Sequence, residues 1–145
     1  MNTLMNASGL IFAAPPLLDF EACDEHEAIR RTTELLAIDS GITNFGGFVD
    51  AVFDPPLLGN GVALPHARSV LAREIVCVAA RCASPVPFGP DAAPVQLIFL
   101  LGVPPHRISE YLGLTASLVQ RLRDPKTLAS LLTANTADEF TALLA

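Results

Sequence analysis

Cations are scarce in this sequence of 145 residues. Nine Lys and Arg stand against 15 Asp and Glu, which gives a formal net charge of −6 and a pI near 4.8. A protein that binds nucleic acid usually carries a stripe of Lys and Arg that neutralises phosphates. This chain has too few cations to build such a stripe easily, so we do not expect it to bind DNA or RNA.

Long apolar runs are also missing. The longest, residues 97–103, is seven residues, whereas a bilayer-spanning helix needs roughly 20. Residues 1–16 contain no Lys or Arg, and their apolar piece, 10–14, is too short for the core of a signal peptide. We therefore expect no direct insertion into a membrane and a cytoplasmic location.

Cysteine is limited to Cys23, Cys77 and Cys82. An odd number of cysteines without a secretion signal indicates reduced, buried thiols rather than a disulfide framework. Cys77 and Cys82 lack the Cys-x-x-Cys spacing of metal sites and have no histidine nearby. We expect no bound metal.

No internal repeat, low-complexity tract or linker divides the chain. Its length suits one ordinary domain, and with 51% hydrophobic and 17% charged residues it is too apolar to be disordered. We expect a loose N-terminal lead-in over residues 1–16, which contains Pro15 and Pro16, followed by a single domain over residues 17–145.

Strands and helices are mixed along the chain. Segments 75–80 and 95–103 are apolar on both faces, as strands covered on two sides must be, and the Pro- and Gly-rich segment 84–94 is expected to connect them. Helix starts are indicated by Asp24, Asp124 and Thr136. We also expect short strands at 17–21 and 62–64 and helices at 45–53, 107–123, 126–132 and 137–144. The helix at 107–123 carries an apolar stripe, made of Ile108, Leu112, Thr115, Val119 and Leu122. The fold class is α/β, with a mixed parallel and antiparallel sheet flanked by helices on both faces.

Three histidines could carry chemistry. His26 lies among carboxylates in the first turn of a helix and reads as a solvated surface residue. His106 follows the longest strand, where a loop histidine is more often inert but could reach a site at the end of the sheet. His66 is different, because Pro65 stiffens the backbone before it and Gly-Asn-Gly lies just upstream, where a backbone or a large anion can approach closely.

Segment 58–68, which contains Ala-Leu-Pro-His, closely resembles the phosphohistidine signature of the enzyme IIA domains of the bacterial phosphotransferase system, of the fructose/mannitol/nitrogen-regulatory type. Other segments resemble the same family in the same order, and together the resemblance covers about residues 17–145. These segments are 18–21, 27–30, 85–88, 94–95 and 112–124.

The resemblance implies a phosphotransferase/anion-transport-like sandwich and a phosphocarrier activity. A histidine of HPr, or of its nitrogen-branch relative, would pass a phosphoryl group to the far (tele) ring nitrogen of His66 while a backbone carbonyl steadies the near nitrogen. His66 would pass the group to a IIB domain or hold it as a regulatory mark. Imidazole suits this work because its neutral nitrogen is nucleophilic near pH 7. The resemblance implies no metal or organic cofactor and leaves sugar transport and nitrogen regulation both open.

Two groups usual in the family are missing here. Residues 53–58 occupy the stretch where the family has an Arg-Glu pair, and Tyr111 takes the place of a second histidine. Candidate replacements that would hold phosphoryl oxygens are Asn60, Arg68, Arg107 and Tyr111. Arg107 and Tyr111 are four residues apart and would share a helix face.

An alternative function follows from these losses. The protein would then be a regulatory module of the same fold that transfers phosphoryl groups poorly and acts by binding protein partners. A third interpretation is an unrelated α/β protein with a chance motif. For the carrier, apolar surface near His66 would dock the donor protein, with Leu57, Leu58 and Val70 as expected members.

Overall fold

The structure is a computed structural model that describes residues 4–5, 11–12, 14–36, 57–68 and 75–144. A long antiparallel hairpin forms the centre of its sheet, made of β7 (Val76–Phe88) and β8 (Ala93–Val103). Both strands were predicted, but β7 continues through much of the segment expected to be a connection. A register shift between Arg81 and Val86 accommodates Pro85, and only residues 89–92 form the turn.

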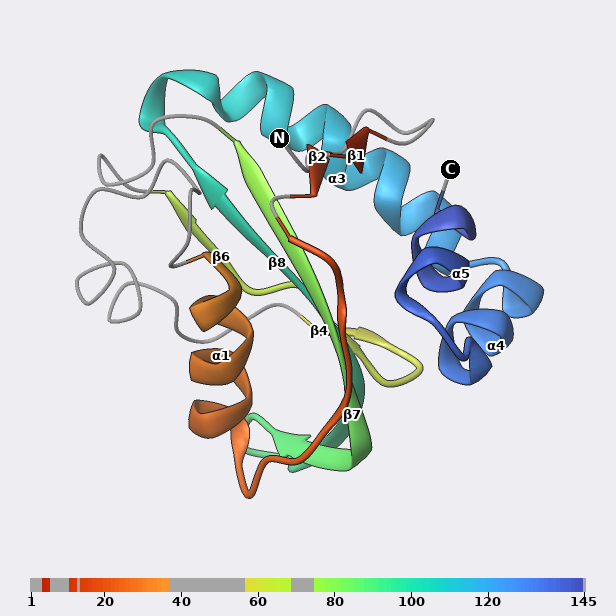
Figure 1. The fold of residues 1–145 in the computed structure, drawn as a ribbon. Coiled ribbons are helices and arrows are strands. Elements are labelled where there is room, and N and C mark those ends of the chain that lie inside the picture. The colour runs from red at the N-terminus through yellow and green to blue at the C-terminus, as the bar shows by residue number, and fades with distance from the viewer. Residues whose placement is uncertain (1–3, 6–10, 13, 37–56, 69–74, 145) are drawn as a thin grey trace.

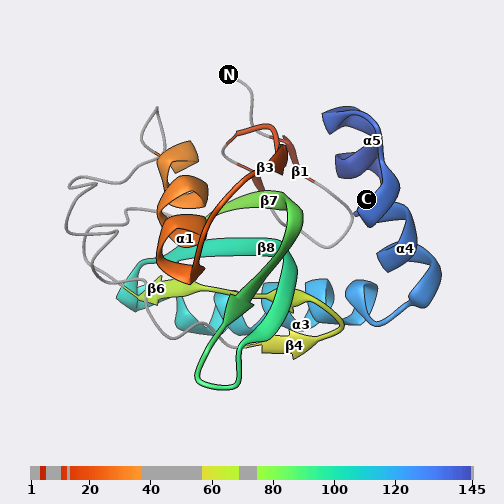
Figure 2. The ribbon, with the colours of Figure 1, turned by 90° about the horizontal axis from the view of Figure 1, so that it is seen from below.

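Shorter strands lie along both sides of this hairpin (Figures 1 and 2). Two short strands pair in parallel with β8, one after the other, and two pair in parallel with β7 in the same way. In both cases proline lies in the segment between the two short strands. The pairs are β5 (Val62–Ala63) with β6 (His66–Arg68), and β2 (Ile11–Phe12) with β3 (Leu17–Phe20). β4 (Leu57–Gly59) and β1 (Leu4–Met5) pair antiparallel outside β5 and β2. The sheet is mixed, as predicted.

Helices cover both faces of the sheet, as its apolar strands predict. Asp24, Asp124 and Thr136 cap their helices by accepting backbone N–H groups, which confirms the three predicted starts. The helices are α1 (Glu25–Thr33), α3 (Ile108–Leu122), α4 (Pro125–Thr133) and α5 (Ala137–Ala142), with 3-10 turns η1 (Glu34–Leu36) and η2 (Pro105–Arg107). The helix expected at 45–53 lies outside the described residues.

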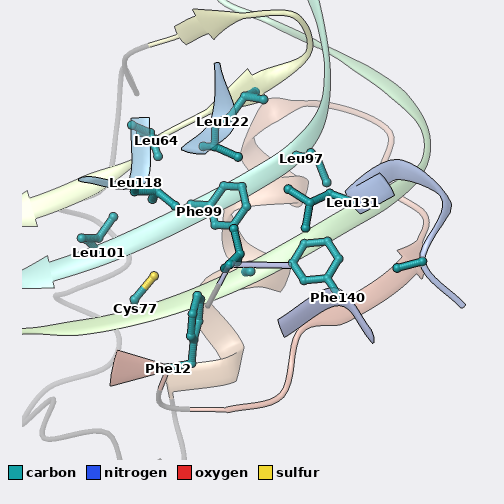
Figure 3. Packing of buried hydrophobic residues seen from close by; sticks show 14 of the residues in the cluster. Phe12, Leu64, Cys77, Leu97, Phe99, Leu101, Leu118, Leu122, Leu131 and Phe140 are labelled. Atoms are coloured by element: carbon teal, nitrogen blue, oxygen red, sulfur yellow. The ribbon is translucent and has the colours of Figure 1, made fainter. Parts of the chain in front are cut away.

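Alternation along the central strands gives the protein two hydrophobic cores. Ile98 and Leu100 of β8 face α1, whereas the residues between and beside them face α3, α4 and α5. Figure 3 shows the second core, in which Phe99 stacks on Phe140 with ring centroids 6.2 Å apart. These cores hold β8 rigid from both sides.

The N-terminal lead-in differs from the loose segment that we expected. Where the structure describes it, residues 4–5 and 11–12 form a two-stranded addition to the sheet, and Phe12 is 4% exposed within the second core. Burying one aromatic side chain contributes roughly 1.5–3 kcal/mol, which offsets part of the entropy cost of ordering the segment at the edge of β7.

One buried cation fastens the outer strand β3 and helix α4 to the sheet. Arg81 of β7 is 4% exposed; its Nε and Nη2 donate to the two carboxylate oxygens of Asp19 at 3.0 Å each, and its Nη1 donates to the carbonyl of Leu131 at 2.9 Å. Leu131 lies in the last turn of α4, where carbonyls lack helical partners. This guanidinium therefore satisfies groups from two other elements.

Replacing Arg81 should destabilise the fold. In Arg81→Met, the carbonyl of Leu131 and the carboxylate of Asp19 lose their donors, so we expect the free energy of unfolding to fall by about 2–4 kcal/mol. Urea denaturation followed by circular dichroism measures the loss. A change below 0.5 kcal/mol, the range of an ordinary surface substitution, would contradict the assignment.

Asp19→Asn is the matched variant, because asparagine tolerates the positive φ of 57° at this position but lacks the charge and one of the two oxygens that accept from Arg81. Since the Asp19 side chain is 63% exposed, we expect a loss of about 1 kcal/mol or less. The hydrogen bonds from Arg81 lower the pKa of Asp19 below its ordinary value. The stabilisation from the ionised Asp19 carboxylate is therefore present above about pH 4 and is lost as the pH falls further. The same pH dependence should be absent from Arg81→Met, because that variant lacks the guanidinium.

The three cysteines are free thiols, as predicted, but only two are buried. Burial raises the pKa of Cys77 well above the ordinary thiol value and that of Cys82 to about 11. Cys23 is exposed, contrary to expectation, because it precedes the N-cap of α1 rather than lying in a strand. The negative charge of Glu27 raises the pKa of the Cys23 thiol.

Thiol titration of the native protein should therefore detect Cys23 alone. With Ellman's reagent at about pH 8, we expect one thiol to react, more slowly than free cysteine because less of it is thiolate. Cys77 and Cys82 should react only after denaturation. Cys23→Ser should abolish the native reaction, and a second fast thiol in that variant would contradict the burial described here.

Candidate functional site

The Gly-Asn-Gly turn reverses the chain between β4 and β5. Gly59, Asn60 and Gly61 all have positive φ, of 82°, 54° and 82°, a conformation that favours glycine and tolerates asparagine. The carbonyl of Gly61 accepts from the N–H groups of Gln96 and Leu97 at 2.8 and 3.0 Å. The turn thus delivers the following residues onto the edge of β8.

The structure places His66 at the start of a strand. β5 stops at Ala63, Leu64 and Pro65 interrupt the pairing, and His66 opens β6 opposite Leu101. The carbonyl of the buried Pro65 accepts from the N–H of Leu101 at 3.0 Å. The backbone is therefore hydrogen-bonded to β8 at Pro65, immediately before His66, and through the pairing of β6.

The His66 ring is half-buried, so part of it remains accessible to solvent. Its Nδ1 lies 3.5 Å from the carbonyl oxygen of Leu64, two residues upstream, at the long end of the hydrogen-bond range. A carbonyl can only accept, so this contact favours the tautomer with the proton on Nδ1. In that tautomer Nε2 carries a free lone pair.

Tyr111 is brought to His66 by the chain that leaves β8. β8 ends at Val103, η2 follows, and α3 then runs back over the sheet, so its first turns lie beside β6 (Figure 1). The Tyr111 and His66 rings have centroids 5.5 Å apart and planes inclined by 33°. This is the contact range of aromatic pairs.

Arg107, the residue expected to share a face with Tyr111, precedes α3 and binds a carboxylate. Its Nε and Nη2 donate to Glu110 at 3.1 and 2.7 Å. These hydrogen bonds lower the pKa of Glu110. Any phosphoryl oxygen would have to compete with Glu110 for this guanidinium.

Asn60 does not join His66. The β8 partners of Val62 and His66, Leu97 and Leu101, are four residues apart, about 13 Å of strand, and Asn60 lies beyond Val62. Arg68 follows His66 by two residues in β6, but its side chain is outside the described part of the chain. Among the candidate partners whose side chains the structure describes, Tyr111 is the one with a ring contact to the imidazole.

The remaining histidines are on the surface. His26, in the first turn of α1, and His106, in η2, are both exposed. Among the described residues, no group of three or more His, Cys, Asp or Glu is arranged to hold a metal ion. Within the same residues, no helix is long and apolar enough to cross a membrane.

The apolar residues expected near His66 are described in part. Leu57 and Leu58 are 40% and 37% exposed in β4, where Leu57 pairs with Ala63, three residues before His66. Val70 lies outside the described residues. Leu112, next to Tyr111, is 61% exposed although the helical stripe placed it in the core. The buried face of α3 is offset from the predicted stripe, because Tyr111, Leu114 and Leu118 contact the second core and Leu112 does not.

Comparison with known proteins agrees with this architecture. The IIA-Ntr nitrogen regulatory protein of Neisseria meningitidis superposes with a TM-score of 0.83 at 27% identity, over 92% of this chain and 94% of that one. The mannitol IIA of Escherichia coli superposes with a TM-score of 0.75 at 23% identity, over 90% and 96% of the two chains. The second likeness concerns the fold alone.

Two curated relatives are larger than the matching segment. The 2-O-alpha-mannosyl-D-glycerate-specific EIIABC component of the E. coli K12 phosphotransferase system is 28% identical over 151 residues, covering 97% of this chain and 23% of the relative. A nitrogen regulatory protein homolog of Haemophilus influenzae is 34% identical over 86 residues, covering 57% of this chain and 52% of the relative. The chain thus spans about a quarter and about half of their lengths.

The profile of one protein family, described as phosphoenolpyruvate-dependent sugar phosphotransferase system, EIIA 2, matches residues 17–145. That match covers most of the chain, including the Gly-Asn-Gly turn, β5, β6 and α3. The chain belongs to the EIIA 2 family of the phosphoenolpyruvate-dependent sugar phosphotransferase system.

Proposed function

We propose that this protein is a phosphocarrier that accepts a phosphoryl group on Nε2 of His66 and passes it on. The observation that carries the proposal is the half-buried imidazole with Nδ1 facing the Leu64 carbonyl. This arrangement leaves Nε2 as the nucleophile on a backbone that is anchored to β8. Family membership supports the same role.

The transfer needs no change of protonation on His66. The Nε2 lone pair forms a bond to phosphorus while the N–P bond of a phosphohistidine donor breaks, and its electron pair returns to the donor's ring. The Nδ1 proton stays near Leu64. Such a step depends on in-line placement of the two rings and on donors for the phosphoryl oxygens.

Protein partners complete the cycle. The donor would be an HPr-like phosphohistidine protein, and the acceptor a IIB domain or a regulatory protein. A structure with 22% identity to this chain and a TM-score of 0.75 is a complex of mannitol enzyme IIA with phosphorylated enzyme IIB from E. coli. This complex supports a IIB domain as the acceptor class.

A second function is favoured by the charges around the site. Arg107 is bound to Glu110, and the other paired cations of the described chain, Arg30, Arg31 and Arg81, have carboxylate partners elsewhere. From these described cations, a doubly charged phosphoryl on His66 would receive few charge-assisted hydrogen bonds, each typically contributing about 1.5–3 kcal/mol. A regulatory module that binds protein partners and transfers slowly fits this observation.

Labelling with radioactive phosphoenolpyruvate, enzyme I and HPr tests the carrier function. We expect acid-labile, base-stable phosphate on the protein, and complete loss of label in His66→Ala. The matched control is His106→Ala, because His106 is an exposed histidine that follows the neighbouring strand. It should label as well as wild type.

The outcomes separate the two functions. Full labelling of His66→Ala would overturn His66 as the acceptor. Absence of label in the wild type, with HPr shown to be phosphorylated, would overturn the carrier function and favour the regulatory module. Transfer onward to a purified IIB domain then measures competence directly.

A further inference from the structure

The Tyr111 ring lies beside the His66 imidazole, at the position where the resemblance to the family places a second histidine. The two rings are in contact, with centroids 5.5 Å apart. Tyr111 itself is half-buried and packs against the second core. The phenol ring is therefore held by the protein interior rather than lying loose on the surface.

The imidazole needs such a support, because its hydrogen bond is long. At 3.5 Å, the contact from Nδ1 to the Leu64 carbonyl is weak. Rotation about χ2 of histidine has broad wells, so one weak bond does not fix the ring plane. A second constraint from the ring face restricts this rotation.

The support is itself well anchored. The Thr115 hydroxyl donates to the Tyr111 carbonyl at 2.8 Å, and the Arg107–Glu110 pair ties together the residues that precede it. Among the described residues, the Tyr111 hydroxyl makes no hydrogen bond. The contact between Tyr111 and His66 is therefore made by their rings.

We propose that Tyr111 is a positioning residue: its aromatic ring, rather than its hydroxyl, holds the His66 imidazole in the plane that keeps Nδ1 at the Leu64 carbonyl and presents Nε2 to the phosphoryl donor. The inference rests on the proposed phosphocarrier function for its purpose. Its physical content, the order of the imidazole, is measurable without any phosphoryl transfer.

Three substitutions separate the ring from the hydroxyl. Tyr111→Phe keeps the flat ring, Tyr111→Leu keeps much of the buried volume without it, and Tyr111→Ala removes both. Gln120→Ala, at an exposed position farther along α3, is the matched control. Thermal unfolding identifies which variants are folded, and if Tyr111→Ala is not, Tyr111→Leu decides the result.

The first measurement is the ¹⁵N NMR spectrum of the His66 ring in the unphosphorylated protein, near pH 8. Wild type, Tyr111→Phe and Gln120→Ala should show one dominant tautomer, protonated on Nδ1. Tyr111→Leu and Tyr111→Ala should show averaged shifts from a tautomer mixture, because the ring is free to leave the Leu64 carbonyl.

The second measurement is the rate of phosphorylation of His66 by phosphoramidate, a small donor that needs no protein docking surface. Nε2 bonds to phosphorus, the P–N bond breaks, and the nitrogen leaves as ammonia with protons from solvent. We expect Tyr111→Phe to react within twofold of wild type. Tyr111→Leu and Tyr111→Ala should be slower by about tenfold, as expected for a misplaced nucleophile.

Two results would overturn the inference. If Tyr111→Phe is as slow as Tyr111→Ala, the hydroxyl and not the ring is responsible. If folded Tyr111→Leu keeps the wild-type tautomer and rate, Tyr111 does not position the imidazole. A wild-type protein that takes no phosphoryl group from HPr contradicts the carrier function instead, and the NMR result stands apart from it.

Discussion

The site depends on the pairing of a proline-interrupted outer strand with β8. Gly61 and Pro65 each place a carbonyl against N–H groups of β8, and His66 follows the second of these anchors. Because β8 is packed on both faces, these hydrogen bonds fix the histidine backbone to the most rigid part of the molecule. Pro65 has no N–H to offer, so the break in pairing falls directly before His66.

Electrostatics separate this site from a general anion site. The chain is acidic, and the cation nearest to Tyr111 in sequence, Arg107, is neutralised by Glu110. Among the described residues, the imidazole contacts a backbone carbonyl and an aromatic ring. Such surroundings orient a neutral nucleophile well but contribute little to holding the charge of a phosphoryl group. Phosphoryl transfer would need both an oriented imidazole and groups that hold the phosphoryl charge. The described residues meet the first requirement more fully than the second.

Much of the fold was predictable because local rules governed it. Runs that are apolar on both faces gave the central strands, and the caps at Asp24, Asp124 and Thr136 gave three helix starts. Continuation of β7 past Pro85 was missed because a register shift, which no local pattern reveals, absorbs the proline. Burial of Phe12 was missed for a similar reason, since its partners lie far along the chain.

The site was predictable in part. The strand-proline-histidine pattern indicated His66, and the resemblance drew attention to Tyr111. Asn60 is adjacent to the motif in sequence but remote in space, because an extended chain carries it away from the histidine. The bond between Arg107 and Glu110 was also missed, although residues three apart on a helix are neighbours and the pair is visible in the sequence.

The same proline interruptions affect how the sheet meets its surroundings. In the described part of the chain, the outermost strands β1 and β4 have two and three residues, and the strands inside them are broken at prolines. Unpaired strand edges are templates for adding further strands, and short or broken edges offer too few consecutive N–H and C=O groups for this. In the described part of the sheet, the margin near His66 thus offers little backbone for pairing with a second copy of the chain.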